Sequence, residues 1–184
     1  LSDCPVVRVE SGHLESRRSG FSLVICFLDM VTFYHNPGPG PPESGDAPGF
    51  GHGWERPVSV EFFTADGAEE FQINCGLRLQ GGHSRRPEKS PKHSFRLVFK
   101  NEYGPKRLDY PLFGEDAAKS FNTITLRAGF CNEWIHWNHD ERRRGQNGRD
   151  IWAKDTQRAM GQPAGRGRYV HLYINGLYWG IYQP

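Results

Sequence analysis

Two runs of alternating apolar residues on either side of a polar, glycine-containing segment constrain the fold more than any other feature of the chain. Before the segment, apolar residues occupy every second position from 71 to 79, and after it they occupy positions 95, 97 and 99. A period of two is typical of a β-strand with one buried face. We therefore expect two strands joined by the segment 81–92, with their polar side chains opposite the core.

The composition favours strands and irregular loops over long helices. Glycine accounts for 22 of the 184 residues, which exceeds the roughly 7% of average proteins. Because only 36% of the residues are hydrophobic and the mean hydropathy is -0.68, the aromatic residues, at 13%, are expected to supply much of the core. The four cysteines are far apart and form no CxxC pair, which disfavours a zinc knuckle. No apolar run approaches the roughly 20 residues of a membrane span.

Short apolar or alternating stretches predict further strands at 21–28, 58–63 and 121–127. Between the strands near 63 and 71, Asp66-Gly67 suits a hairpin turn. The clearest hairpin comes last, where two alternating runs flank Asn175-Gly176, a pair that favours a type I′ turn. We expect both faces of this hairpin to be covered.

One helix is predicted, with Asp150 as its N-cap and a stop at Gly161 and Pro163. The residues before it, including 140–144, are predicted to form a loop, and 1–20 and the Pro/Gly-rich segment 36–53 are predicted to be irregular. The expected fold class is α+β, a mostly antiparallel β-sheet with one mid-length helix packed near the end. We divide the chain into an irregular or poorly ordered segment, 1–53, and a domain, 54–184.

The segment between the two central strands is rich in groups that bind anions. From Arg78 to Arg107 there are nine basic and two acidic residues, although the net charge of the whole chain is only +2. Glycines let backbone N–H groups approach a ligand, and Ser, Arg and Lys supply donors that phosphate oxygens accept. A phosphate-binding surface is our leading hypothesis, and a solvated hairpin is the alternative. No GxxxxGK[ST] or GxGxxG motif is present, so the spacing does not name a nucleotide.

The order of motifs resembles the CotH-type spore-coat protein kinase family. The resemblance covers roughly residues 54–184 and is carried by WERPVSVEFF, GLRLQGGHSRRPEKSPKHSFRLVFKNEYG, YPLF, ITLRAG, RDIWAKDTQRAMG and YVHLYINGLYWGIY. It implies a divergent protein-kinase-like fold, of which this chain is the nucleotide-side part. It also implies ATP and Mg or Mn as cofactors, Ser or Thr of a coat or surface protein as the acceptor, and a secreted, cell-surface or spore-coat location.

The resemblance also implies which residues lie beside the nucleotide. The cofactor-binding candidates are Arg78, Gly82, Ser84, Lys89, Lys92, Ser94 and Arg96, with Lys89 and Lys92 as alternatives for the phosphate lysine. The aspartates that bind metal and perform catalysis in the family are expected beyond the last hairpin. We therefore expect no catalytic or metal-binding residue here, and a nucleotide-side fragment that is inactive alone. Asp109, Asp150 and Asp155 are interpreted as turn, cap and surface-helix residues.

Two functions of other classes stay open beside the kinase hypothesis. One is a non-catalytic secreted or surface adhesion or coat module that uses the same fold to display loops. The other is a nucleic-acid binder, which the near-neutral total charge and the absence of an RRM-like aromatic motif disfavour. The expected partners are accordingly a nucleotide and a coat or surface protein, with no nucleic acid.

A few residues outside the central segment are weaker candidates. His136, His139 and Asp140 are spaced closely enough to bind a metal, but they do not form an HExxH pair. Trp134 and Trp137 are candidates to stack on adenine or to be core aromatics. Arg127 lies in a predicted strand near small residues, which favours a buried ion pair or a phosphate contact.

Overall fold

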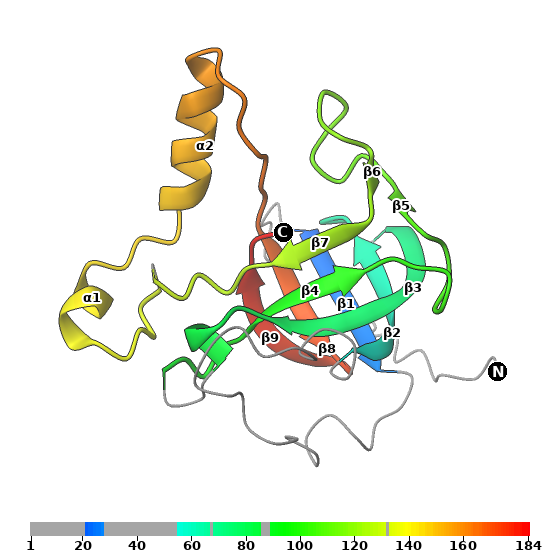
Figure 1. Ribbon diagram of the computed structural model, residues 1–184, viewed down its shortest axis with the longest axis horizontal. Coiled ribbons are helices and arrows are strands. Elements are labelled where there is room, and N and C mark those ends of the chain that lie inside the picture. Colours follow the sequence, from blue (N-terminus) through cyan, green and yellow to red (C-terminus); the bar gives the residue numbers. More distant parts are fainter. Residues whose placement is uncertain (1–20, 28–54, 67, 86–88, 132) are drawn as a thin grey trace.

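A computed structural model describes residues 21–27, 55–66, 68–85, 89–131 and 133–184, and seven of the strands in these ranges form one curled sheet (Figure 1). The predicted irregular segments 1–20 and 36–53 lie outside the described residues. The sheet has the strand order β7-β4-β3-β2-β1-β8-β9. Its strands are β1 Phe21–Phe27, β2 Arg56–Phe63, β3 Glu69–Gln80, β4 Ser94–Val98, β7 Thr123–Leu126, β8 Val170–Ile174 and β9 Leu177–Tyr182.

All neighbouring strands of this sheet are antiparallel except β1 and β8, which are parallel. The two edges of the curled sheet meet. Arg127, just after β7, forms an antiparallel bridge with Gln183, just after β9. Each of these two residues donates its backbone N–H to the carbonyl of the other, at 2.8 and 3.1 Å. We call this contact the seam. β1 lies in the middle of the sheet, so the strand at 21–27 belongs to the same sheet as residues 56–182.

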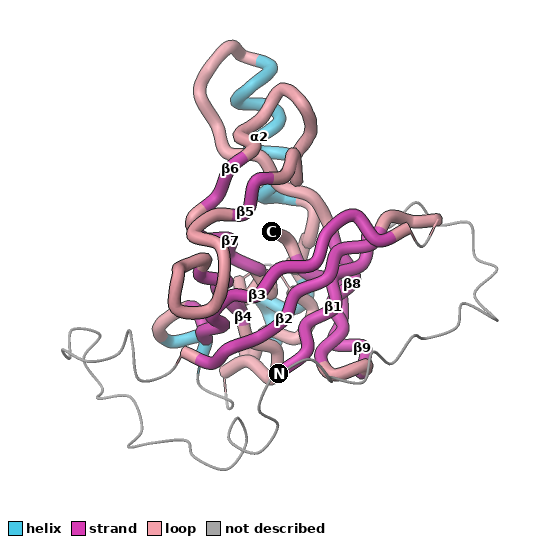
Figure 2. Tube along the Cα trace, turned by 90° about the vertical axis from the view of Figure 1, so that its right-hand side faces the viewer, coloured by secondary structure: helices cyan, strands magenta, loops and turns pink. Residues whose placement is uncertain are grey.

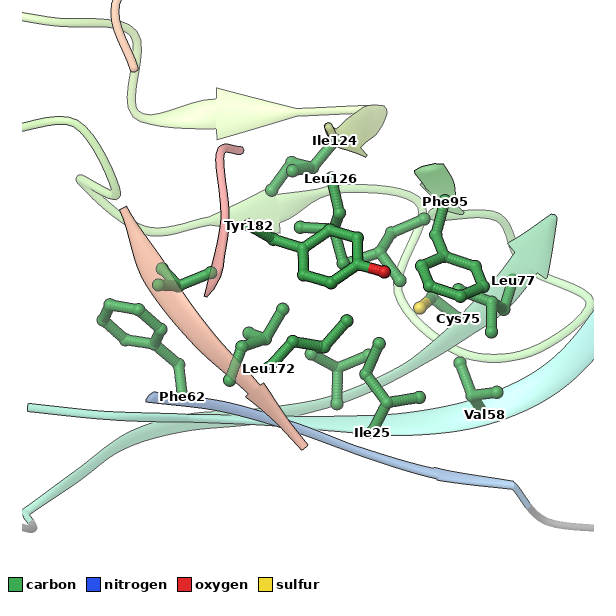
Figure 3. Close-up of a cluster of buried hydrophobic side chains, with 14 of the residues drawn as sticks. Ile25, Val58, Phe62, Cys75, Leu77, Phe95, Ile124, Leu126, Leu172 and Tyr182 are labelled. Atoms are coloured by element: carbon green, nitrogen blue, oxygen red, sulfur yellow. The ribbon is translucent and has the colours of Figure 1, made fainter. Parts of the chain in front are cut away.

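The apolar core fills the inside of the curl. Side chains from all seven strands point toward one another there, as Figure 3 shows for Ile25, Val58, Leu77, Leu126 and Tyr182. Each of these five is at most 1% exposed. The predicted alternation is confirmed in the central strands, where Cys75, Leu77, Phe95 and Leu97 are buried and their neighbours Arg78 and Arg96 are on the other face.

Both predicted hairpin turns are confirmed. β2 and β3 pair across the Asp66 turn, where the backbone N–H of Thr64 donates to the carbonyl of Ala68. β8 and β9 pair across Asn175 and Gly176, whose φ angles of 49° and 79° are those that a type I′ turn requires. The protein is therefore mainly β-sheet, and most neighbouring strands are antiparallel. The expected mostly antiparallel sheet is confirmed.

Several smaller elements differ from the prediction. The single strand predicted at 121–127 is broken at Asn122, whose carbonyl accepts from Phe99. Its first part, β6 Ser120–Phe121, pairs instead with β5 Leu108–Asp109. The predicted loop at 140–144 contains the short helix α1 His139–Arg143, which Asn138 caps with its side chain. A 3-10 turn, η1 His83–Arg85, lies between β3 and β4.

The predicted helix is present as α2, Arg149–Ala159, but its start and its packing were predicted wrongly. Gly148 is the N-cap, and Asp150 lies inside the first turn, where its carboxylate forms ion pairs instead of capping the helix. No residue of α2 is buried, and Trp152 is 70% exposed. Figures 1 and 2 both show α2 and the β5–β6 pair extending from the same end of the sheet.

The last hairpin was also predicted to be covered on both faces, and this is wrong for β9. Leu177, Tyr178 and Ile181 are 45–66% exposed. Alternation of apolar residues along β9 identified the strand correctly, but it carries no information about what lies outside it. None of the helices in the described ranges is long and apolar enough to cross a membrane.

Candidate functional site

The seven candidate residues share the outward face and the connecting loop of β3 and β4. In the antiparallel register, Arg78 lies opposite Arg96 and Gln80 lies opposite Ser94. These side chains are on the face away from the core, as the period-two pattern predicts. The structure does not bring all seven together. Lys92 precedes β4 by two residues, and its ammonium contacts the carbonyl of Ile181 on β9.

Arg78 is engaged by a carboxylate that sequence analysis missed. Its Nε donates to Oε2 of Glu55, whose side chain is only 1% exposed, and the ammonium of Lys100 pairs with the other carboxylate oxygen. Burial raises the pKa of Glu55, but hydrogen bonds from Lys100, Tyr103 and Arg78 outweigh it and lower the pKa overall. We call Glu55, Arg78, Lys100 and Tyr103 the Glu55 cluster.

Gly76 leaves room for this cluster. A Cβ atom at that position would lie 2.6 Å from Cδ of Glu55 and 2.6 Å from Cε2 of Tyr103. A glycine in the middle of a strand commonly marks a close approach by another group. Gly76 was therefore the sequence signal that could have indicated a group packed on this face.

Lys92 lies beside the seam, where it contacts the last residues of β9. Its Nζ donates to the carbonyl of Ile181 at 2.6 Å, lies 3.7 Å from Oε1 of Glu133, and is 4.6 Å from the centre of the Tyr182 ring. Burial lowers the pKa of Lys92, and the charge of Glu133 partly opposes this effect. Burial likewise raises the pKa of Glu133 against the opposing effect of Lys92. The pair is thus partly desolvated and held in one geometry.

The other loop candidates have individual contacts. The hydroxyl of Ser94 accepts the backbone N–H of Ala128 at 2.9 Å and so fixes β4 to the end of β7. The carbonyl of Ser84 is 3.2 Å from Nδ1 of His93. Lys89 is 5.3 Å from the centre of the Trp137 ring. A Cβ atom at Gly82 would meet nothing within 4 Å, so the backbone there is open to a ligand.

Arg127 forms an ion pair whose acidic partner could not be predicted from the sequence. Its guanidinium pairs with Oδ2 of Asp150, and the same oxygen accepts from Lys154 at 2.7 Å and from Gln183 at 3.0 Å. Arg127 is 42% exposed, so the predicted ion pair is present but not buried. Burial raises the pKa of Asp150, but hydrogen bonds from Lys154 and Arg127 dominate and lower it to about 2. Asp150 therefore fixes the first turn of α2 to the seam.

We expect Asp150→Asn to weaken the attachment of α2 in a pH-dependent way. A carboxylate whose pKa is depressed on folding stabilises the native state above its unfolded pKa of about 3.9, and this contribution is lost as the pH falls toward about 2. The wild type should therefore be more stable than Asp150→Asn at pH 6, and the difference should shrink between pH 4 and pH 2. Thermal unfolding followed across this range measures it, and a difference independent of pH would contradict the role of the charge.

The seam also borders a small polar pocket. It encloses about 350 Å³ of empty space, part of it open to solvent, and its lining includes Arg127, Glu133, Asn147, Tyr169 and Gln183. Gly129, with φ of 81°, lies against the carboxylate of Glu133. The pocket and Lys92 thus share Glu133 and Tyr182, so the loop and the seam form one continuous polar region.

The remaining candidates do not form a metal site. His136 is buried and stacks on Trp137 at 3.8 Å between ring centres, while His139 is exposed beside Asp140. Over the residues that the structure describes, no three His, Cys, Asp or Glu side chains are grouped as metal ligands would be. Trp134 is 65% exposed and donates to the carbonyl of Gly145, so it is not a core aromatic.

The family model of CotH kinase protein matches residues 77–184, which is more than half of the chain. The chain belongs to the CotH kinase family. This membership confirms the resemblance and indicates a kinase-related function. The CotH match begins inside β3 and includes Lys92, Glu133 and the seam, whereas β1 and β2 lie outside it. No curated protein matches the chain.

Proposed function

We propose that this chain is the nucleotide-side part of a CotH-type protein kinase, which transfers a phosphoryl group from ATP to a Ser or Thr hydroxyl of a coat or surface protein. The observation that carries the proposal is the placement of Lys92. A partly buried ammonium, oriented by Glu133 and by the carbonyl of Ile181, lies at the end of a glycine-containing loop in a member of the CotH family. We further propose a divergent kinase-like fold and a location at the cell surface or spore coat.

The loop residues fit the phosphates of a nucleotide. Backbone N–H groups near Gly82 are accessible, Ser84 has a hydroxyl, and Lys89 and Lys92 supply two positive charges. Phosphate oxygens accept from all these groups. In this assignment Arg78 and Ser94 do not contact the nucleotide. They hold the strands that carry the loop, because their side chains already bond to Glu55 and to Ala128. Bound ATP would supply the phosphoryl group, and these residues would hold and orient its charged end.

The proposal gives no catalytic or metal-binding role to a carboxylate of this chain. Glu133 is paired with Lys92, and Asp150 is paired with Arg127 and Lys154. Each of these carboxylates would have to lose a cation before it could accept a divalent metal ion. Neither carboxylate is therefore assigned to metal binding or catalysis.

We expect Lys92→Ala to weaken ATP binding by about 10- to 100-fold, which corresponds to the loss of one charge-assisted hydrogen bond. Calorimetric titration of ATP with magnesium measures the affinity, and circular dichroism checks that the variant is folded. Lys106→Ala is the matched control, because Lys106 is exposed and lies outside the loop. Equal affinity of wild type and Lys92→Ala would contradict the proposed phosphate role.

A surface or coat module is the second candidate function. The observation that favours it is the number of large apolar side chains left exposed on the helical region and on β9. Trp134, Trp152, Met160, Leu177 and Tyr178 are all more than half exposed. Surfaces of this kind often mark protein contacts. Failure of ATP to bind the wild type, together with self-association in sedimentation velocity, would favour this candidate over the kinase.

A further inference from the structure

Three arginines lie on the outward face of the neighbouring strands β3 and β4 and at the end of β7. Arg78 pairs with Glu55, and Arg127 pairs with Asp150. Arg96, on β4, has a buried Nε without a hydrogen-bond partner, and no ion pair connects it to a residue in the described part of the chain. A half-buried guanidinium without an acceptor is uncommon, because buried polar groups are generally hydrogen-bonded.

The position of Arg96 adds a second unfavourable feature. In the sheet register it lies directly opposite Arg78 on one side and Thr125 on the other. Like charges directly opposite each other on a sheet destabilise it. Glu55 offsets the charge of Arg78, but its other oxygen is already paired with Lys100. The register therefore places two arginines and a threonine at adjacent positions on one face of the sheet, and a carboxylate pairs with only one of the two arginines.

We propose that Arg96, Arg78 and Thr125 form a binding site for a phosphoryl group on the outward face of the sheet. The forked donors of arginine match phosphate oxygens, and a threonine hydroxyl supplies a further donor. A bound dianion would accept from the guanidinium of Arg96, which is half-buried, and would offset the repulsion between the two arginines. The site is distinct from the loop around Lys92, whose ammonium contacts the carbonyl of Ile181 on β9 and the carboxylate of Glu133.

The phosphoryl group has two chemical sources that this site could accept, a phosphorylated serine side chain and a nucleotide. The Nε–Hε signal of Arg96 in the NMR spectrum of the full 184-residue chain reports binding directly. We expect saturable shifts of this signal with inorganic phosphate and with O-phosphoserine. A similar shift with ATP that persists in Lys92→Ala would identify the nucleotide as a second source for the same site.

Variants of Arg96 separate binding from structure. Arg96→Gln should weaken phosphate binding by on the order of tenfold or more, and Arg96→Lys should retain part of it because it keeps the charge without the fork. Without ligand, the melting temperature of Arg96→Gln should equal or exceed that of the wild type, because a like-charge contact is removed. Arg143→Gln, an exposed change on α1, is the control for loss of one charge.

Phosphate should raise the melting temperature of the wild type and of Arg143→Gln by more than it raises that of Arg96→Gln. An Arg96 signal that none of the three probes perturbs would overturn the proposal. It would equally be overturned if Arg96→Gln lost stability without ligand and kept the full response to phosphate. Neither result bears on the proposed nucleotide role of Lys92, which the ATP titration tests separately.

Discussion

Replacing Glu55 by alanine is expected to lower the free energy of unfolding by about 3–5 kcal/mol, the usual effect of removing one partner from a buried ion pair. The side chain of Glu55 is 1% exposed and is in contact with Arg78, Lys100 and Tyr103. Without the carboxylate, two cations would remain beside a cavity on the outward face of the sheet. Unfolding in guanidinium chloride measures the change.

Glu102→Ala is the matched control for this prediction. Glu102 pairs with the same Lys100 at 2.8 Å, but its side chain is 55% exposed. Exposed ion pairs contribute about 0–1 kcal/mol, so this variant should unfold nearly as the wild type does. Equal effects of the two variants would show that burial of Glu55 does not determine the strength of the cluster.

The second large effect is expected from Tyr182→Ala, which should destabilise the fold by about 3–5 kcal/mol, as large-to-small changes of buried aromatic residues do. The ring is 1% exposed, packs against Phe95 with 5.8 Å between ring centres, and lies under the ammonium of Lys92. Its loss would open a cavity inside the curl and remove one support of Lys92. Denaturant unfolding measures the stability, and ATP titration on the folded fraction measures the binding.

Two further variants divide this effect into its parts. Tyr182→Phe removes only the hydrogen bond from the hydroxyl to the carbonyl of His93, so it should cost about 0.5–1.5 kcal/mol. Tyr178→Ala removes a tyrosine from the same strand that is 54% exposed, and it should cost less than about 1 kcal/mol. If Tyr178→Ala proved as costly as Tyr182→Ala, the assignment of Tyr182 to the core would be wrong.

The strands were predictable because their signals are local. Apolar alternation identified β3 and β4, and the Asn175-Gly176 pair identified the last hairpin. The parallel pairing of β1 with β8 was not predictable, because it joins segments far apart in the sequence and depends on no turn between them. The exposure of α2 was missed for a related reason, since helical spacing of Ile151 and Trp152 does not reveal whether another element covers them.

The site was predictable only in outline. The period of two placed Arg78 and Arg96 on one face, and the register confirms that they are neighbours. The carboxylates could not be assigned, because Glu55 and Glu133 lie outside the alternating runs and meet their partners only through the tertiary fold. Glycines gave the available signal, since Gly76 and Gly129 each leave space for one of these two side chains.

The strand order has a practical consequence for any attempt to produce this domain from its family boundaries. β1 and β2 lie between β3 and β8, although the family match begins only at residue 77. A polypeptide trimmed to 77–184 would lack the middle of the sheet and would expose two bare strand edges, which invite pairing with other chains. Soluble expression therefore requires a start before Phe21, so that the matched segment can close around its two inner strands.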